Sequence, residues 1–267
     1  MGEDRFDRQS FLGAGSQPVI ERAVVGVMGL GGGGSHVVQQ LAHVGFLRYV
    51  IYDPDVVEES NLNRLVGATE SDVREKTPKV EVAKRVAFGL RSEAIVEAYT
   101  QRWQENPEPL RACDILFGCL DGFGERRELE AASRRYLIPL IDIGMDIHRV
   151  GDEPPRMGGQ IILSMPGGPC MFCLGFLNER TLAREGERYG DAGARPQVIW
   201  PNGVLASTAV GVAVDLLTDW TQSLRSAVYM EYDGNRGTLR QHARLQYLRE
   251  GACPHYPAAA VGDVVLL

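Results

Sequence analysis

Apolar runs and amphipathic segments alternate along the first half of the chain. Five short apolar runs have the length of buried strands: residues 23–28, 49–52, 94–99, 115–120 and 139–143. Apolar residues recur at helical spacing in three other segments: 35–45, 79–91 and 125–136. Strands that alternate with helices predict an α/β fold with a doubly wound, mainly parallel sheet of Rossmann-like type. Residues 4–22 are expected to form an N-terminal helix or arm.

The second half of the chain has a different pattern. Proline and glycine punctuate residues 151–169, and no strand or helix is assigned there. The polar segment 178–198 predicts a long loop or a weak helix, and the apolar segment 203–217 predicts a buried helix. Alternating residues at 228–232 and 238–247 predict two antiparallel strands. The sheet is therefore expected to end in a C-terminal antiparallel extension.

Composition and charge exclude several classes of protein. A chain of 267 residues with 44% hydrophobic and 24% charged residues suits one α/β domain with an elaborated C-terminal part, or at most two small domains. The net charge of −7 does not favour a broad nucleic-acid-binding surface. The most apolar stretch, Val204–Leu217, is too short to span a bilayer, so no membrane is expected. A charged start and five cysteines lead us to expect a cytoplasmic protein.

A glycine-rich turn is the first signal of chemistry. Gly29, Gly31 and Gly34 fit the pattern G-x-G-x-x-G directly after a predicted strand, and Gly32 adds to the turn. Such a turn lets the backbone approach phosphates, and the following helix directs free N–H groups at the anion. Asp53 ends the next predicted strand about 20 residues on, where a carboxylate can accept hydrogen bonds from ribose hydroxyls. This unit predicts a nucleotide, without choosing among ATP, NAD and FAD.

Further residues make that choice. Arg8-Gln9 stands near the start, DPDVVEESNLNR fills 53–64, Lys79 lies in KTPKVEVAKR, and Asp121 follows the fourth predicted strand. In this order the chain resembles the ThiF/HesA/molybdopterin-synthase adenylyltransferase family, the bacterial relatives of ubiquitin-activating enzymes. The resemblance extends over roughly residues 5–260. It implies one ThiF-type adenylation domain over 1–267, with a nucleotide-binding half (1–150) and a half (151–267) for the crossover loop, zinc knot and carrier binding.

The resemblance also implies a role for each matching residue. Asp53 is expected to hold the ribose of ATP, with Asp55 beside it in the nucleotide site, although Asp55 also suits a turn cap. Asn61, Arg64 and Lys79 are expected to contact the triphosphate. Individually, these side chains could equally be turn or surface residues.

Two more expectations concern the α-phosphate and a second subunit. Asp121 is expected to engage magnesium near the α-phosphate. Arg8 is expected to reach the nucleotide site of a partner subunit, which implies a homodimer. The residue after the aspartate is often Asn in the family and is Gly122 here, so one auxiliary polar contact is in doubt.

The cysteines predict a structural zinc knot. The candidate ligands form two groups, Cys170 with Cys173, and Cys253 with His255. The family often carries two CxxC pairs, but Tyr256 occupies the last cysteine position of the second pair here. Three thiolates and one imidazole still make a tetrahedral Cys₃His set. His242 ranks lower as the fourth ligand, and a zinc-free relic with packed thiols is the alternative.

A catalytic cysteine that accepts the activated carboxylate as a thioester is not expected. Residues 174–252, where relatives carry it, contain no cysteine. Cys113 and Cys119 flank a predicted buried strand and are interpreted as core residues. Activation is therefore predicted to end at the acyl-adenylate, which would pass to another protein.

The predicted activity is ATP-dependent adenylation of the C-terminal Gly-Gly carboxylate of a ubiquitin-like or sulfur-carrier protein, with release of pyrophosphate. One alternative is adenylation of another group, such as a peptide C-terminus or a modified tRNA base. An NAD(P)-binding oxidoreductase ranks lower, because hydride transfer has no use for Arg8, Arg64 and Lys79 together. A catalytically dead dimeric scaffold is disfavoured by the intact motif set.

Overall fold

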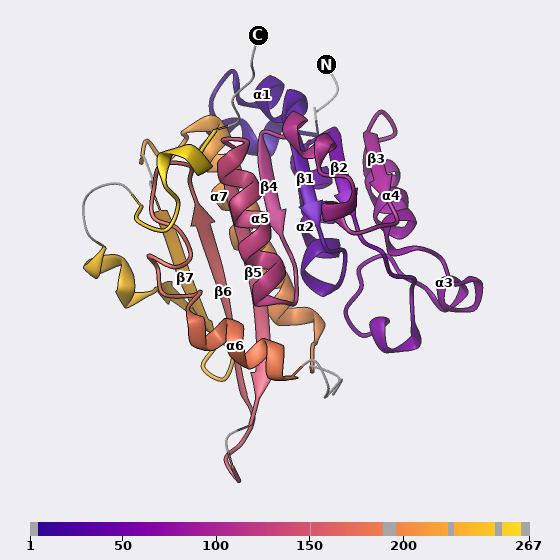
Figure 1. Cartoon of the computed structure of the whole chain (residues 1–267). Helices are drawn as coiled ribbons and strands as arrows, with labels where there is room; N and C mark the ends of the chain where they lie inside the picture. The colour runs from indigo at the N-terminus through magenta and orange to yellow at the C-terminus, as the bar shows by residue number, and fades with distance from the viewer. Residues whose placement is uncertain (1–4, 150, 189–195, 224–226, 249–252, 263–267) are drawn as a thin grey trace.

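One eight-stranded mixed sheet organises the computed structural model, which describes residues 5–149, 151–188, 196–223, 227–248 and 253–262 (Figure 1). The strand order is β3-β2-β1-β4-β5-β6-β7-β8. The strands are β1 (Val24–Met28), β2 (Arg48–Tyr52), β3 (Ile95–Tyr99), β4 (Ile115–Gly118), β5 (Leu140–His148), β6 (Arg156–Ser164), β7 (Ala227–Asp233) and β8 (Thr238–Gln241). The first five strands are parallel, and β6, β7 and β8 each pair antiparallel to the preceding strand. The predicted mainly parallel sheet with an antiparallel extension is confirmed.

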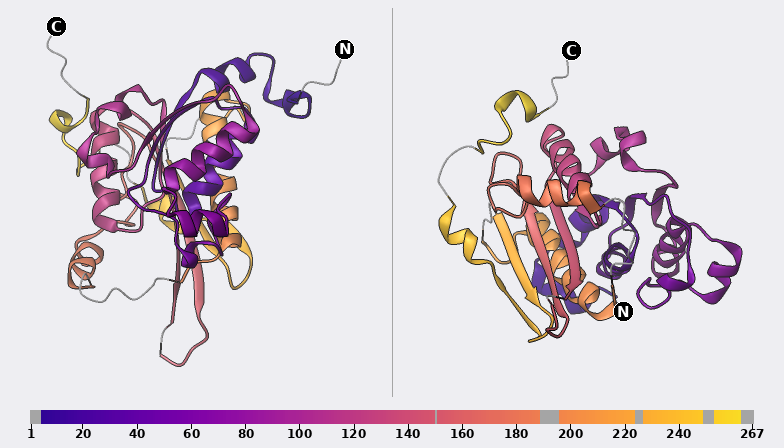
Figure 2. Two further views of the ribbon diagram at one scale, coloured as in Figure 1. Left: turned by 90° about the vertical axis from the view of Figure 1, so that its right-hand side faces the viewer. Right: turned by 60° about the horizontal axis from the view of Figure 1, so that its bottom comes forward.

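Helices cover both faces of the sheet (Figures 1 and 2). One face carries α1 (Ser16–Arg22), α2 (Gly32–Val44), α4 (Lys79–Leu90) and α7 (Ile199–Thr218), which pack on one another and on the sheet. The other face carries α5 (Phe123–Arg135), beside which lies α6 (Glu179–Arg188). A short helix, α3 (Glu70–Glu75), follows β2, and a 3₁₀ helix (Asp7–Leu12) precedes α1. The polar segment 178–198 thus begins with a helix, and its residues 189–195 lie outside the described part.

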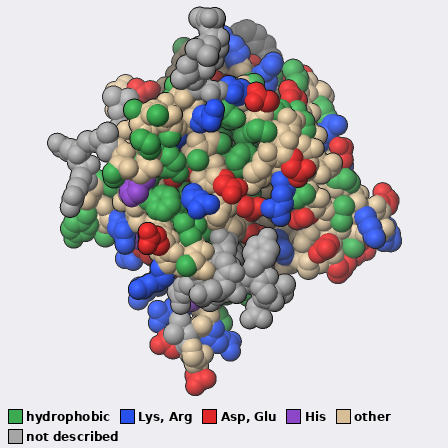
Figure 3. Space-filling model, viewed as in Figure 1, with side chains coloured by type: hydrophobic (Ala, Val, Ile, Leu, Met, Phe, Trp, Pro, Cys, Tyr) green, Lys and Arg blue, Asp and Glu red, His purple; other side chains and the backbone are tan. Residues whose placement is uncertain are grey.

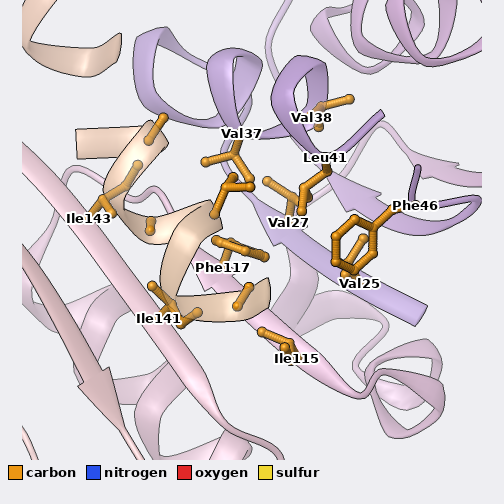
Figure 4. Packing of buried hydrophobic residues seen from close by; sticks show 14 of the residues in the cluster. Val25, Val27, Val37, Val38, Leu41, Phe46, Ile115, Phe117, Ile141 and Ile143 are labelled. Atoms are coloured by element: carbon orange, nitrogen blue, oxygen red, sulfur yellow. The ribbon is translucent and has the colours of Figure 1, made fainter. Parts of the chain in front are cut away.

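The packing of the core explains why the strands could be predicted from apolar runs in the sequence. Side chains of β1, β4 and β5 alternate between the two faces, so each strand contributes to both cores. On the α2/α7 side, Val27, Phe117 and Ile141 pack against Val37 and Leu41 of α2 (Figure 4). All five side chains are buried. Strands buried on both faces appear as continuous apolar runs in the sequence, as observed here.

No strand was predicted from the sequence over 151–169, and this was wrong. Strand β6 occupies Arg156–Ser164, in the middle of the antiparallel half. The glycines in this segment suggested a loop, but Gly159 marks close packing. A Cβ on Gly159 would lie 2.7 Å from Leu205 of α7 and 2.9 Å from the Gly144 carbonyl oxygen. Glycine is therefore needed there because α7 and β5 approach the strand closely. The second predicted C-terminal strand is also shorter, since a 3₁₀ helix follows at Ala243–Tyr247.

Helix α7 is long and strongly apolar. Among the described helices it is the one whose length and composition would suit a membrane span. It packs against α2, β5 and β6, with residues such as Leu205, Ala209 and Ala213 fully buried. This is the packing of a core helix, as the sequence predicted for 203–217.

Candidate active site

A cleft of about 310 Å³ lies at the carboxyl ends of the parallel strands. The strand order reverses between β1 and β4, and open α/β sheets place their ligand crevice at such a switch point. Nine of the residues singled out from the sequence line this cleft: Gly29, Gly31, Gly32, Asp53, Asp55, Asn61, Arg64, Lys79 and Asp121. Segments far apart in the sequence thus converge on one site.

The glycine turn is sterically obligatory at two positions. Gly29 has φ of +87°, and a Cβ there would lie 2.4 Å from the Cys119 carbonyl oxygen. A Cβ on Gly34 would lie 1.9 Å from the Gly29 carbonyl oxygen. Gly31 is the N-cap of α2, and a Cβ there would meet no atom within 4 Å. Gly31, Gly32 and Gly33 line the cleft, so an anion bound there can approach the start of α2.

Asp53 ties the glycine turn to the end of β2. Its carboxylate accepts hydrogen bonds from the backbone N–H of Leu30 (2.6 Å) and of Asp55 (2.9 Å). Burial raises the pKa of Asp53, while the nearby Lys79 ammonium and the two backbone donors act to lower it. Lys79 Nζ lies 2.7 Å from Asp55 Oδ2 and 4.0 Å from Asp53 Oδ1. The lysine is thereby held at the cleft wall with its charge partly balanced.

The segment after β2 carries Asn61 and Arg64 to the cleft. Asn61 is buried, and its Oδ1 accepts a hydrogen bond from the Glu58 N–H at 3.1 Å. Arg64 Nη1 donates to Asn63 Oδ1 at 3.0 Å and to the Ser60 carbonyl oxygen. Arg64 also passes close to Gly32, where a Cβ would lie 3.4 Å from its Cδ. The Arg64 side chain therefore passes beside the start of α2, where an anion would bind.

Asp121 lies on the opposite wall, just before α5 begins. It is an exposed residue, and its Oδ1 accepts a hydrogen bond at 3.3 Å from Gln197 Nε2. Gly122 serves as the N-cap of α5 without a side chain. The structure thus places Asp121 and Arg64 on two walls of one cleft.

Arg8 and Gly34 are the predicted nucleotide-side residues that do not line this cleft. Gly34 lies within the first turn of α2, and its close contact with Gly29 shapes the turn. Arg8 is exposed and belongs to the 3₁₀ helix before α1. The next residue, Gln9, donates a hydrogen bond at 2.8 Å to the carbonyl oxygen of Val44, the last residue of α2. Because α2 spans about 20 Å and begins at the cleft, Arg8 lies at the far end from its own chain's site.

Sequence reasoning missed a buried ion pair beneath the cleft. The Arg126 guanidinium contacts the Asp142 carboxylate and donates to the carbonyl oxygens of Leu120 and Ile143. It thereby joins the ends of β4 and β5 next to Asp121. Gly144 makes room for this arginine, since a Cβ there would lie 2.5 Å from an Arg126 Nη2. The sequence signal is the first arginine of GERR after Asp121, which lies in the predicted helix 125–136.

The Cys170, Cys173, Cys253 and His255 side chains form one cluster whose ligand atoms all lie within 4.8 Å of one another. Sulfur–sulfur distances of 3.6 Å join Cys173 to Cys170 and to Cys253. His255 Nδ1 lies 3.4 Å from Cys170 Sγ, 3.4 Å from Cys173 Sγ and 3.9 Å from Cys253 Sγ. A tetrahedral zinc site requires about 3.8 Å between two sulfurs and about 3.5 Å between sulfur and nitrogen. The cluster could therefore hold zinc.

Tyr256, which occupies the position of the missing fourth cysteine, contacts Glu130 and Arg134. Its hydroxyl donates to Glu130 Oε2 at 3.2 Å, and Arg134 lies over its ring. Glu130 also accepts a hydrogen bond from the Met171 N–H, between the first two cysteines. His242, the lower-ranked ligand, lies outside the cluster and stacks on Tyr229.

The two remaining cysteines are poorly suited to nucleophilic chemistry. Cys113 is buried, and burial raises the pKa of its thiol to about 12. Cys119 lines the cleft, but burial and the nearby Asp142 carboxylate raise its pKa still further. Because the thiolate is the nucleophile, both environments oppose thioester formation.

The fold and this cleft define an α/β protein with a glycine-turn site at the switch point of its sheet. The ThiF family model matches residues 6–255, and the chain belongs to that family. The chain is 32% identical to the SAMP-activating enzyme E1 of Haloferax volcanii and 35% identical to the sulfur carrier protein adenylyltransferase of Thermus thermophilus. Each match covers 64% of this chain, but only 61% and 63% of those relatives.

Other relatives match over nearly the whole chain. The vegetative HesA protein of Trichormus variabilis is 27% identical, and the match covers 95% of this chain and 92% of that protein. Among solved structures, E. coli MccB with ATP matches with a TM-score of 0.74 at 20% identity, over 95% of this chain and 73% of that one. That likeness supports the fold described above.

The Arg126–Asp142 pair predicts a pH-dependent effect on stability. Burial raises the pKa of Asp142 to about 6, against about 4 for an unfolded chain. A raised folded-state pKa contributes stability that is present below about pH 4 and is lost as the pH rises through about 6. In urea unfolding at several pH values, the stability of the wild type relative to Asp142→Asn should fall by up to about 3 kcal/mol between pH 4 and pH 7. A pH-independent difference would contradict the buried, proton-binding state of Asp142.

Proposed function

We propose that this chain is an ATP-dependent adenylyltransferase that activates the C-terminal carboxylate of a ubiquitin-like or sulfur-carrier protein. The observation that carries the proposal is the convergence of Arg64, Lys79 and Asp121 on one cleft with the glycine turn and Asp53. Hydride transfer would need no such set of phosphate-directed charges. On this proposal residues 1–150 bind the nucleotide, residues 151–267 receive the carrier, and the whole chain acts as one adenylation domain.

The chemistry explains the types of residue. A carboxylate oxygen of the carrier attacks the α-phosphorus of ATP, the bond from that phosphorus to the β-phosphate bridging oxygen breaks, and pyrophosphate leaves with the electron pair. No proton transfer is required, so catalysis depends on positioning and on stabilising charge at the phosphate oxygens. Arg64 can form a two-pronged contact with phosphate oxygens, while Lys79 provides a compact charge. Asp53 would hold the ribose at the end of β2.

Asp121 is suited to bind a magnesium ion whose other ligands would come from the nucleotide. Magnesium in ATP-using enzymes is held by one or two carboxylates together with substrate phosphates, and Asp121 presents a carboxylate on the cleft wall. Bound there, the ion would supply neutralisation of phosphate charge. Asp121 would orient it towards the α-phosphate.

The carrier substrate is inferred from the relatives and from the cysteines. Two of the relatives above 30% identity are named as a SAMP-activating enzyme and as a sulfur carrier protein adenylyltransferase. The raised pKa values of Cys113 and Cys119 favour transfer of the acyl-adenylate to a separate acceptor. A Gly-Gly end is part of the proposal, since a tail of small residues can thread a narrow cleft.

A peptide C-terminus is the second candidate substrate. The specific observation is the fold match, over 94% of this chain, to MccB, which has been solved in complex with N-formylated MccA. The two candidates differ in the size of the partner, so a direct comparison of substrates separates them.

We further propose that the chain works as a homodimer in which Arg8 completes the partner's cleft. Arg8 is exposed at the end of α2 opposite its own cleft, so it can serve a nucleotide only in another copy. We place the reaction in the cytoplasm, where ATP is available and thiols stay reduced.

The first prediction concerns pyrophosphate exchange. Labelled pyrophosphate should enter ATP only in the presence of a carrier with a C-terminal Gly-Gly, and Asp121→Ala should lower the rate by about a hundredfold or more. Glu128→Ala, which removes an exposed carboxylate on α5, the helix that follows Asp121, is the matched control and should leave the exchange unchanged. Exchange that depends on a short peptide alone favours the second candidate, and binding of NADH without ATP would refute both.

The second prediction tests the role of Arg8 by subunit mixing. Arg8→Ala and Asp121→Ala should each be inactive alone. When they are mixed, about half of the dimers contain one subunit of each kind, and each such dimer has one intact site. Exchange should therefore recover to about a quarter of the wild-type rate. If no activity returns although mass spectrometry shows mixed dimers, Arg8 does not act across subunits.

The third prediction concerns the metal. The purified chain should contain one zinc ion, held by Cys170, Cys173, Cys253 and His255. His255→Ala should release zinc to a colorimetric chelator much faster than the wild type, because one of four ligands is lost. His242→Ala is the control, since that imidazole lies outside the cluster. A folded, zinc-free wild type would overturn the assignment.

A further inference from the structure

Gln197 bridges the two walls of the cleft. It lies near the end of the polar segment 178–198, two residues before α7 begins at Ile199. Its backbone carbonyl oxygen accepts a hydrogen bond at 3.0 Å from Asn63 Nδ2, on the wall that follows β2. Its side-chain amide donates at 3.3 Å to Asp121 Oδ1, on the wall that follows β4. One residue thus contacts segments that are separated by 58 positions in the sequence and belong to opposite sides of the switch point.

The backbone next to Gln197 is anchored from the first turn of α7. Asn202 is buried, and its Nδ2 donates to the Val198 carbonyl oxygen at 2.9 Å. The same amide packs on the glycine turn, where a Cβ at Gly32 would lie only 2.4 Å from Asn202 Nδ2. The position of Gln197 is therefore fixed by a contact that reaches the nucleotide turn itself.

The partner on the other wall is also part of the site. Asn63, which holds the Gln197 carbonyl oxygen, accepts a hydrogen bond from Arg64 Nη1 at 3.0 Å. Arg64 in turn lies beside Gly32. A short series of polar contacts therefore runs from the arginine to Asn63, to Gln197 and on to Asp121.

From these contacts we infer that Gln197 is a positioning residue that orients the Asp121 carboxylate for the divalent cation that accompanies the nucleotide. This inference rests on the function proposed above. Asp121 is exposed, and the hydrogen bond from Gln197 restrains the rotation of its side chain. An amide donor supplies that restraint and carries no charge. An arginine or lysine in its place would compete with the cation for the carboxylate.

The test measures nucleotide binding as a function of magnesium. Gln197→Met keeps the length of the side chain and removes the amide donor. Fluorescence titration with the ATP analogue that has a methylene group between its α- and β-phosphorus atoms gives the magnesium concentration for half-maximal binding. That concentration should rise about three- to tenfold in the variant, as expected for the loss of one hydrogen bond to a charged group. Binding of the analogue in EDTA and the melting temperature should stay at wild-type values.

Gln104→Met is the matched control. Gln104 also lines the cleft, but its amide donates to Glu128 at 2.9 Å and not to Asp121. This variant should keep the magnesium dependence of the wild type. In an Asp121→Asn background, Gln197→Met should cause no further change in magnesium dependence, because the carboxylate it positions is gone.

Each other outcome counts against the inference. An unchanged magnesium requirement in Gln197→Met, or an equal loss of binding with and without magnesium, shows that Gln197 does not act through Asp121. An additive effect in the Asp121→Asn background leads to the same conclusion. If the wild type fails to bind the analogue at all, the proposed function is refuted and this inference is refuted with it, whereas wild-type binding with an unshifted variant refutes only the role of Gln197.

Discussion

The hydrogen bond from the Leu30 N–H to the Asp53 carboxylate, at 2.6 Å, is the interaction on which the cleft depends. It fastens the glycine turn to the end of β2, and it does so with a carboxylate that is almost completely buried. The same carboxylate accepts the Asp55 N–H, which places Asp55 against Lys79. The start of α2, Asp53 and Lys79 are therefore linked by a short series of contacts at the end of β2. These contacts fix the position of the glycine turn relative to the charged residues on the walls of the cleft.

The opposite side of the cleft is built on a second buried junction. Arg126 joins the ends of β4 and β5 and pairs with Asp142, directly behind Asp121. Four positions further along α5, Glu130 contacts Tyr256 and the turn that carries the first two cysteines. Helix α5 thus connects the Asp121 wall with the Cys/His cluster. A metal in that cluster would stabilise α5, which carries Arg126, although the cluster itself lies away from the cleft. On the face drawn in Figure 3, acidic and basic side chains are interspersed over the described surface.

The sequence predicted those parts of the structure that depend on local patterns. Buried parallel strands appeared as apolar runs, and the glycine turn and Asp53 were readable because their spacing is set by a single βαβ unit. Two cysteines three positions apart and a Cys-Pro-His triplet were enough to predict the metal cluster. Strand β6 was missed because glycine usually interrupts strands, whereas Gly159 is required here by the close approach of α7. The Arg126–Asp142 pair and the Gln197–Asp121 contact join residues that are 16 and 76 positions apart, and no periodicity or motif connects them. The reach of Arg8 into a second subunit stays a prediction.

The central claim is that this cleft directs a carboxylate to the α-phosphorus of ATP, and an isotope measurement tests it most directly. The carrier would be prepared with ¹⁸O in its C-terminal carboxylate and incubated with the enzyme and unlabelled ATP. If the account is right, hydrolysis of the acyl-adenylate at its carbonyl carbon leaves one ¹⁸O on AMP, and the pyrophosphate contains none. Appearance of ¹⁸O in inorganic phosphate, with ADP as the other product, would show attack at the γ-phosphorus and contradict the account.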